Sequence, residues 1–209
     1  MTLVNRKLIK LNNRGVRNVT TFGSVGGGAL TFIKKLTSDG SDDDLSFVDG
    51  TSDVVIDSTY KEYCFIFNNI HPETNDVFFQ FQGNAAGGSG YNETITSTHF
   101  RTYHFEDGTA SGLAYRSGND QAQATGFQRL SEEIGNGNDE SLSGYLHLFN
   151  PSSTTYVKHF IARTSGQIGS PRDVYVAGYF NTTSAIDEIQ FKMSADEIQG
   201  GTICLYGIK

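Results

Sequence analysis

Apolar and polar residues alternate with a period of two along most of the chain after residue 28. The clearest stretches are 30–36 (LTFIKKL), 45–48, 53–57, 60–67, 77–82, 93–105, 145–149, 173–180, 186–193 and 202–208. Because successive side chains of a β-strand point to opposite faces, this period predicts half-buried strands. Turn sequences rich in Gly, Asn and Asp separate them.

The final ten residues, GGTICLYGIK, also alternate. Ile203 and Leu205 fall on one face, and Cys204 and Tyr206 fall on the other. Chain ends usually fray unless they are paired. The pattern therefore predicts a last strand that is paired inside a sheet and closes the domain.

One hairpin can be given an expected register from its own sequence. If NPSS (150–153) is a four-residue loop, Leu146 lies opposite Val157 and Leu148 lies opposite Thr155, with His159 and Ile161 further along the same face. The opposite face then pairs His147 with Tyr156 and Tyr145 with Lys158. Both faces would carry apolar mass, which is typical of central strands covered on two sides.

About ten such strands, and no stretch with a three-turn helical pattern, predict an all-β fold, an antiparallel β-sandwich. We expect a jelly-roll connection, with a related Greek key as the alternative. Residues 29–209 form this domain, and residues 1–28 form an extended N-terminal arm ending in a glycine linker. The long polar stretch 106–126 is expected to be a loop, and 127–134 fits either a strand or a helical turn.

The composition agrees with a β-rich domain, and the sequence also bears on membrane insertion, secretion and disulfide formation. The 209 residues include 24 Gly, 15 Phe and 10 Tyr but no Trp. No apolar run is long enough for a membrane span, and the N-terminus lacks the apolar core of a secretory signal. The two cysteines, Cys64 and Cys204, are expected to be free thiols within strands rather than a disulfide.

The net charge of −7 is unevenly distributed. Residues 1–28 contain five basic residues and no acid, which leaves 11 basic and 23 acidic residues, a net charge of −12, in the rest. We expect the arm to order when it docks on a partner, rather than to remain a flexible tail, because apolar residues are spaced among its bases. The proposed docking residues are Arg6, Lys7, Leu8, Lys10, Arg14, Arg17 and Phe22. Five basic residues without aromatic residues between them are only a weak indication of nucleic-acid binding, so nucleic acid is not the expected partner.

No motif indicates catalysis or a cofactor. The five histidines are scattered, and His99 and His104 point to opposite faces of one strand by parity. Metalloprotease and serine-hydrolase spacings are absent from the sequence. The glycine-rich segment 83–90 is followed by no helix that could bind phosphate. The chain is therefore expected to be neither an enzyme nor a cofactor protein.

Two binding sites remain as weaker candidates. The acidic turn 38–44 contains Asp39, Asp42 and Asp44, which could bind calcium, but it lacks the spacing of an EF-hand, so a solvated turn is the preferred interpretation. Exposed aromatic residues could stack on sugars. The candidates are Tyr91, Tyr103 and Tyr115, together with Tyr145, and the loops 84–92 and 106–126 are expected to contact a bound polysaccharide.

Several stretches resemble a family of virion structural proteins of marine tailed bacteriophages, including cyanophages. They are 45–72, GYLHLFNPSSTTYVKHFIART (144–164), VAGYFNTTSAIDEIQFKMS (176–194) and the ending GGTICLYGIK. The resemblance covers residues 29–209, and it brings no catalytic motif. It implies a β-sandwich assembled on a phage particle, in the host cytoplasm, as a capsid decoration, tail or fibre component.

The implied partners are other virion proteins and further copies of the chain. We expect the arm to be the attachment point and the sandwich to form a symmetric oligomer such as a homotrimer. The alternative function is a host-recognition module that binds surface polysaccharide. A glycan-cleaving enzyme ranks last, because no pair of catalytic carboxylates can be identified.

Overall fold

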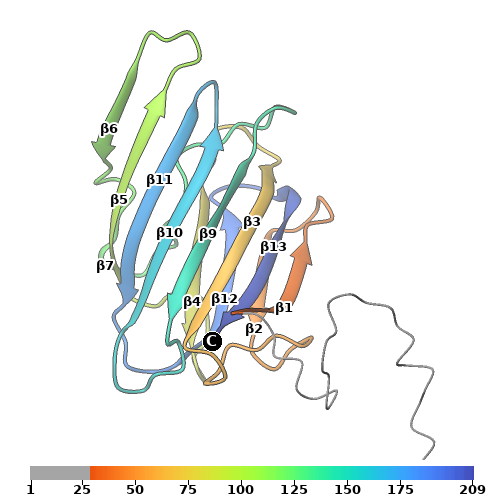
Figure 1. Ribbon diagram of the computed structural model, residues 1–209, viewed down its shortest axis with the longest axis vertical. Coiled ribbons are helices and arrows are strands. Elements are labelled where there is room, and N and C mark those ends of the chain that lie inside the picture. Colours follow the sequence, from red (N-terminus) through yellow and green to blue (C-terminus); the bar gives the residue numbers. More distant parts are fainter. Residues whose placement is uncertain (1–28) are drawn as a thin grey trace, which may run out of the picture.

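The computed structural model describes residues 29–209 as a stack of two β-sheets (Figure 1). The arm and its proposed docking residues lie outside the described residues. The strands are β1 (Leu30–Thr37), β2 (Asp44–Val48), β3 (Glu62–Pro72), β4 (Phe79–Ala85), β5 (Ile95–His104), β6 (Ser111–Tyr115), β7 (Ala122–Ala124), β8 (Gln128–Arg129), β9 (Leu142–Phe149), β10 (Lys158–Gln167), β11 (Pro171–Phe180), β12 (Ile186–Met193) and β13 (Ile198–Ile208). The all-β prediction is confirmed. Among residues 29–209, no helix is long and apolar enough to cross a membrane.

All strand pairs are antiparallel. The large sheet has the order β1-β13-β3-β9-β10-β11-β5-β6, with β7 also paired to β5, and the small sheet has the order β2-β12-β4-β8. The antiparallel sandwich is therefore confirmed, whereas this strand order does not confirm a jelly-roll connection, which stays a prediction. In Figure 1 the large sheet is in front and the small sheet lies behind it.

The C-terminal strand occupies the position that its sequence predicts. β13 pairs with β1 on one side and with β3 on the other, so its backbone is bonded along both edges. Ile203 and Leu205 are fully buried between the sheets, and Cys204 and Tyr206 lie on the opposite side. Both cysteines are free, as expected.

Phenylalanine side chains fill the space between the sheets. Phe191 of β12 is at their centre, because its ring lies within 5.2 Å of the rings of both Phe65 and Phe67 on β3. It also stacks on Phe79 of β4, with centroids 5.8 Å apart and an interplanar angle of 13°. Edge-to-face and offset-stacked pairs of this kind add to the free energy gained from burial alone.

The expected register of the β9–β10 hairpin is wrong. Leu146 pairs with Ala162 and Leu148 with Phe160, so His159 and Ile161 lie on the opposite face from the two leucines. The connection is longer than four residues because its backbone bonds to other segments. The Asn150 N–H donates to the carbonyl of Lys61, and the Pro151 carbonyl accepts from Ile186.

Three other segments differ from the sequence prediction. Residues 53–57 form no strand, although Val54 and Ile56 are buried as an irregular part of the core. The polar stretch 106–126 contains β6 and β7, which extend the large sheet. In 127–134 the strand interpretation holds only for Gln128–Arg129.

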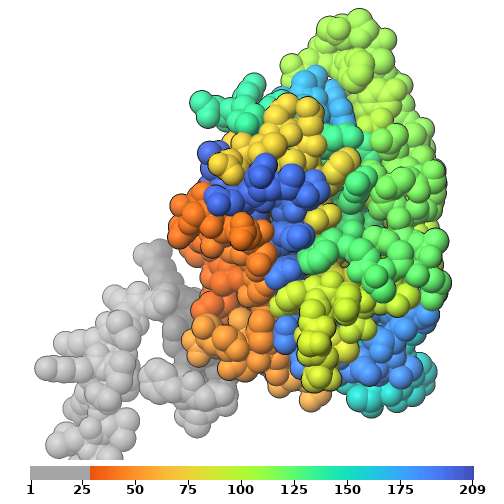
Figure 2. All heavy atoms as spheres, turned by 180° about the vertical axis from the view of Figure 1, so that it is seen from behind, coloured from red at the N-terminus to blue at the C-terminus, as the bar shows by residue number. Residues whose placement is uncertain are grey.

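The small sheet covers only part of the large one. Figure 2, seen from behind, shows that the segments following β5, in green, lie beside the strands of the small sheet. Residues 119–134 carry a series of buried side chains there, including Asn119, Gln128, Leu130 and Glu132. The inner face of β5 is therefore covered by a loop, and the outer face of the large sheet is the side seen in Figure 1.

Candidate binding face

We define the outer face as the side of the large sheet that points away from the small sheet. Cross-strand neighbours align on it in two rows that run perpendicular to the strands. The first row is Cys204, Ile66, Tyr145, Arg163, Tyr175, Phe100 and Tyr115, and the second is Phe32, Tyr206, Cys64, His147, Ile161, Ala177 and Thr98. Each row connects seven strands, so residues distant in sequence form one surface.

Apolar side chains of both rows remain exposed to solvent. Phe32 is 56% exposed, Tyr115 56% and Ile161 50%. Leu113 of β6, which lies opposite Thr102 of the same face, is 69% exposed. Extended apolar patches on a protein surface usually mark interaction sites, whereas single exposed apolar residues do not.

The first row contains an ordered aromatic group. Phe100 and Tyr175 stack with ring centroids 5.0 Å apart and an interplanar angle of 5°. The Arg163 guanidinium lies 4.8 Å from the Tyr175 centroid and donates two hydrogen bonds, of 2.9 and 2.8 Å, to the Asp173 carboxylate. Hydrogen bonding to Arg163 lowers the pKa of Asp173, so this carboxylate stays charged and neutralises the arginine. The group is an aromatic stack without net charge, in which the rings of Phe100 and Tyr175 cover one face of each other.

A thiol and an imidazole of the second row lie next to the carboxylate of Glu62, which is on the same face of β3. Glu62 accepts a hydrogen bond from Nδ1 of His147, and Nε2 of His147 lies 3.6 Å from the Cys64 Sγ. With the Nδ1 proton directed at the carboxylate, Nε2 is free to accept from the thiol. This order matches the nucleophile, base and orienting acid of covalent catalysis.

Two features oppose nucleophilic chemistry at Cys64. Burial, with a smaller contribution from Glu62, raises the thiol pKa to about 11, so the thiol remains protonated near neutral pH. β3 is paired with β13 on one side and β9 on the other, so the backbone N–H groups around Cys64 are used in the sheet. None of these amides is free to stabilise an oxyanion. We interpret the three residues as structural, with the Cys64 thiol buried beneath the half-buried side chains of His147 and Glu62.

Shallow hollows lie on the outer face at both ends of the second row. One, of about 450 Å³, is lined by Leu30, Ile66, Tyr145, His147 and Ile208 among others. The second, of about 440 Å³, is lined by residues such as Thr98, His159, Ile161, Ala177 and Tyr179. Both are open and mainly apolar, which suits protruding side chains of a partner more than a small polar ligand.

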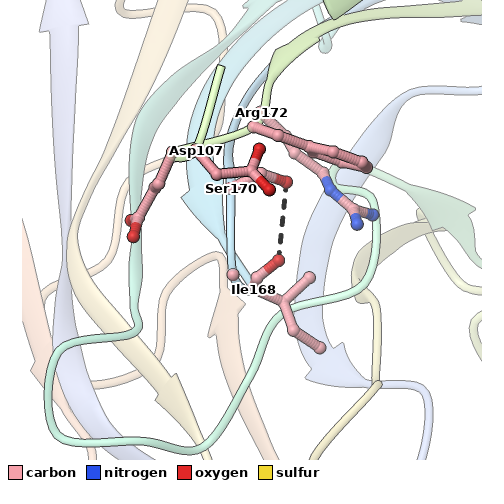
Figure 3. Close-up of a pocket in the computed structure, with 7 residues that line it drawn as sticks. Asp107, Ile168, Ser170 and Arg172 are labelled. Carbon is pink, nitrogen blue, oxygen red and sulfur yellow. Dashed lines mark hydrogen bonds between the residues drawn. The ribbon is translucent and has the colours of Figure 1, made fainter. Parts of the chain in front are cut away.

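A third hollow, of about 410 Å³, lies away from this face, between the β5–β6 and β10–β11 turns (Figure 3). Asp107 and Glu106 come from the first turn, and Ile168 and Ser170 come from the second. Arg172 lines the same hollow, but its guanidinium donates to Glu133 at 2.8 Å. The positive group is already neutralised, so the hollow has no free charge that would select an anion.

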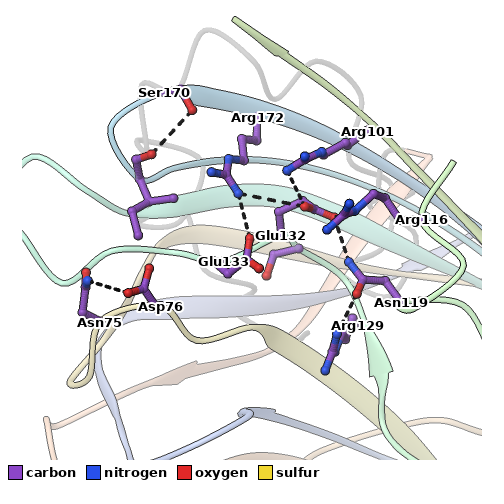
Figure 4. A network of polar contacts seen from close by, with 12 residues as sticks. Asn75, Asp76, Arg101, Arg116, Asn119, Arg129, Glu132, Glu133, Ser170 and Arg172 are labelled. Atoms are coloured by element: carbon purple, nitrogen blue, oxygen red, sulfur yellow. Dashed lines mark hydrogen bonds and ion pairs between the residues drawn. The ribbon is translucent and has the colours of Figure 1, made fainter. Parts of the chain in front are cut away.

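A buried polar network fixes the loop behind β5 (Figure 4). The Glu132 carboxylate has no exposed surface and accepts hydrogen bonds from Arg101, Arg116 (3.0 Å) and Asn119 (2.7 Å). Arg129 donates to the Asn119 side chain at 2.6 Å. Because protein donors already bond to both oxygens of the buried Glu132 carboxylate, we interpret the network as structural.

The predicted sugar-binding tyrosines do not form one site. Tyr115 lies on the outer face, where its hydroxyl donates to Asp120 at 2.5 Å. Tyr103 points to the inner side, under Arg101 at 5.1 Å. Tyr91 lies in the loop after β4, half-buried, and burial raises its pKa to about 12, with Ser46 and Glu188 of the small sheet nearby. Tyr145 joins Tyr115 in the first row.

In the acidic turn, each candidate aspartate accepts a hydrogen bond from a residue close to it in sequence. Asp39 accepts from the backbone and hydroxyl of Ser41, which lowers its pKa, and Asp42 accepts from the Asp39 N–H at 2.8 Å. Asp44 accepts from Ser46 at 2.7 Å. Within residues 29–209, no three His, Cys, Asp or Glu side chains converge as metal ligands.

Sequence reasoning missed most of the outer face. The sequence pattern does not indicate that His147, Ile161 and Arg163 share a surface. Their alignment depends on the strand order β9-β10-β11 and on the hairpin register. The one sequence feature that pointed to this surface was the presence of apolar residues on both faces of 145–149, which indicated that the second face of the strand is also covered. Comparisons of the chain with protein-family models, with curated proteins and with solved structures found no match.

Proposed function

We propose that this chain is a non-enzymatic structural protein of a bacteriophage virion, in the capsid decoration or in the tail or fibre. The observation that carries the proposal is the outer face. It carries several exposed aromatic and aliphatic side chains, Phe32, Leu113, Tyr115 and Ile161 among them, on a chain whose residues 29–209 have a net charge of −12. Exposing such a surface to water costs free energy that burial in an assembly recovers.

The sequence resemblance of residues 29–209 to virion proteins of marine tailed phages supports the same function. In this proposal the basic arm, residues 1–28, attaches the chain to the particle, and the sandwich forms a homo-oligomer. The protonated state of Cys64 and the fully paired backbone around it support the non-enzymatic part of the proposal.

Particle composition tests this function. Virions assembled with the full chain are expected to contain it in many copies, measured by quantitative mass spectrometry and by antibody labelling of intact particles. A chain of residues 29–209 alone, supplied in its place, should fold and yet not be incorporated. Absence of the full chain from purified particles would refute the structural role, and normal incorporation of the truncated chain would refute the anchor.

A second candidate, binding of host surface polysaccharide, is favoured by the ring of Tyr115, which is 56% exposed on the outer face. Sugar rings bind to flat, exposed aromatic surfaces of this kind. A glycan array probed with the full chain tests it, with Tyr115→Ala as the variant that should lose binding and Tyr91→Ala as the control. If the full chain bound no glycan, the polysaccharide-binding candidate would be rejected and only the assembly role would remain.

A further inference from the structure

We infer that the outer face packs against the outer face of a second copy of this chain, around a two-fold axis near Ile161 and Tyr145. This inference rests on the proposed function, because it names the partner that a structural protein would bury there. It also replaces the trimer expected from sequence with a dimer as the basic unit. Area, charge and symmetry each support it.

The area is sufficient for a stable dimer. Eight strands lie side by side from β1 to β6. At about 4.8 Å between strands and 3.3 Å per residue, strands of about ten residues give a face on the order of 1,000 Å². Specific interfaces bury about 800 Å² on each partner. A face-to-face pair could therefore bury the area of a standard interface without using any loop.

The charge distribution selects this face for contact between like copies. Along its strands the charged side chains are Lys35, Glu62, Arg163 and Asp173, which sum to zero. Arg163 and Asp173 neutralise each other directly, and Glu62 is bonded to His147. Two chains that each carry −12 over residues 29–209 repel one another elsewhere, whereas this face contributes no net repulsion.

The exposed apolar residues lie at both edges and at the centre of the sheet, and this distribution suits two-fold symmetry. Phe32 is on the edge strand β1, and Leu113 and Tyr115 are on the opposite edge strand β6, so a central two-fold axis places one edge against the other. β9 and β10 are the fourth and fifth of the eight strands in the sheet, and they carry Tyr145, 38% exposed, and Ile161, 50% exposed. A two-fold axis at this centre brings the same residues of both copies together, as an isologous interface requires. Twisted sheets pack face to face at about 10 Å with their strands about 30° apart, and side chains of this size fill that space.

Sedimentation velocity of the full chain tests the proposal, with Ile161→Asp as the disrupting variant. The wild type is expected to be a dimer at micromolar concentration. Ile161→Asp should raise the dissociation constant at least about 100-fold, because each dimer would bury two unpaired carboxylates. Tyr156→Asp is the matched control, since Tyr156 is 71% exposed but lies in the β9–β10 connection outside the sheet. It should remain a dimer.

A second variant keeps the test valid if the aspartate impairs folding. Ile161→Cys should form a covalent dimer under mild oxidation, because the two residues meet near the axis, while Tyr156→Cys should not. A monomeric or trimeric wild type, or an Ile161→Asp chain that folds and still dimerises, would overturn the proposal. So would a full chain that is monomeric while residues 29–209 dimerise, since the arm would then cover the face.

Glycan binding by a monomeric wild type that is lost in Ile161→Asp would also overturn the proposal, because a sugar and not a second copy would then cover the outer face. These results are separate from those of the particle experiment. A dimer absent from virions contradicts the proposed function alone, and a monomer present in virions contradicts the face-to-face packing alone.

Discussion

Glu132, on the loop after β8, forms an ion pair with Arg101 of β5 in which the carboxylate is fully buried. Arg116 and Asn119, from the segment between β6 and β7, bond to the same carboxylate. A single side chain thus connects three segments on the part of the large sheet beyond the small sheet. The relationship explains why a long polar stretch can be ordered without a helix or a hydrophobic core of its own.

Replacing Glu132 is therefore expected to be costly. Glu132→Gln should lower the free energy of unfolding by about 3–5 kcal/mol, because the guanidinium groups of Arg101 and Arg116 lose their counter-charge inside the protein. Urea denaturation measures the change. Glu133→Gln is the matched control, since Glu133 is 33% exposed and pairs mainly with Arg172, and it should cost about 1 kcal/mol or less. Equal losses in both variants would contradict a special role for Glu132.

His99 gives a prediction about acid stability. Its imidazole is fully buried, and this burial lowers the pKa from 6.5 to about 4. Between these values the unfolded chain binds a proton that the folded chain does not, so stability falls as the pH decreases from 6.5 to 4. The full contribution of this group is about 3 kcal/mol.

His99→Gln removes the titrating group and keeps a polar side chain of similar size. Its unfolding free energy, measured by urea denaturation at several pH values from 7 to 4, should fall less steeply than that of the wild type. Carboxylates titrate in both proteins, so the difference between the two curves isolates the histidine. Parallel curves would show that His99 does not contribute.

Gly144 of β9 is predicted to tolerate no side chain. A Cβ there would lie 2.3 Å from the Arg163 carbonyl oxygen and 2.7 Å from the Thr164 Cα, both on β10. Gly144→Ala should therefore push β9 and β10 apart and cost about 1–3 kcal/mol in thermal or urea unfolding. Gly118→Ala is the control, because nothing lies within 4 Å of its Cβ position. Similar melting curves for the two variants would refute this packing.

Deleting residues 202–209 should prevent folding. β13 joins β1 to β3, and Ile203 and Leu205 are fully buried, so the deletion opens the large sheet and removes part of the core. The shortened chain is expected to show no cooperative thermal transition by circular dichroism. Deleting residues 1–28 is the comparison, and that chain should melt cooperatively. A cooperative transition in the C-terminal deletion would contradict the closing role of β13.

The period of the sequence was sufficient to predict the buried side of the last strand and which residues of one strand share a face. Ile203 and Leu205 of β13 are buried as predicted, and His99 and His104 lie on opposite faces of β5, as parity indicated, with His99 on the buried face. Side-chain alternation follows from the local geometry of an extended backbone, so it needs no knowledge of neighbouring strands. The all-β class and the sandwich follow from the same local signal.

The sequence alone thus determined most of the strands and the alternation of their side chains, but not the surface that the strands form together. The alignment of Ile161 with His147 and Ala177, the loop bonded to Glu132 and the β9–β10 register all depend on pairing between distant segments. Those pairings are chosen by the packing of the whole core and by backbone bonds such as Asn150 to Lys61. Since shifting one strand pairing can move side chains to the other face, only the tertiary structure could place the residues of the outer face on a single surface.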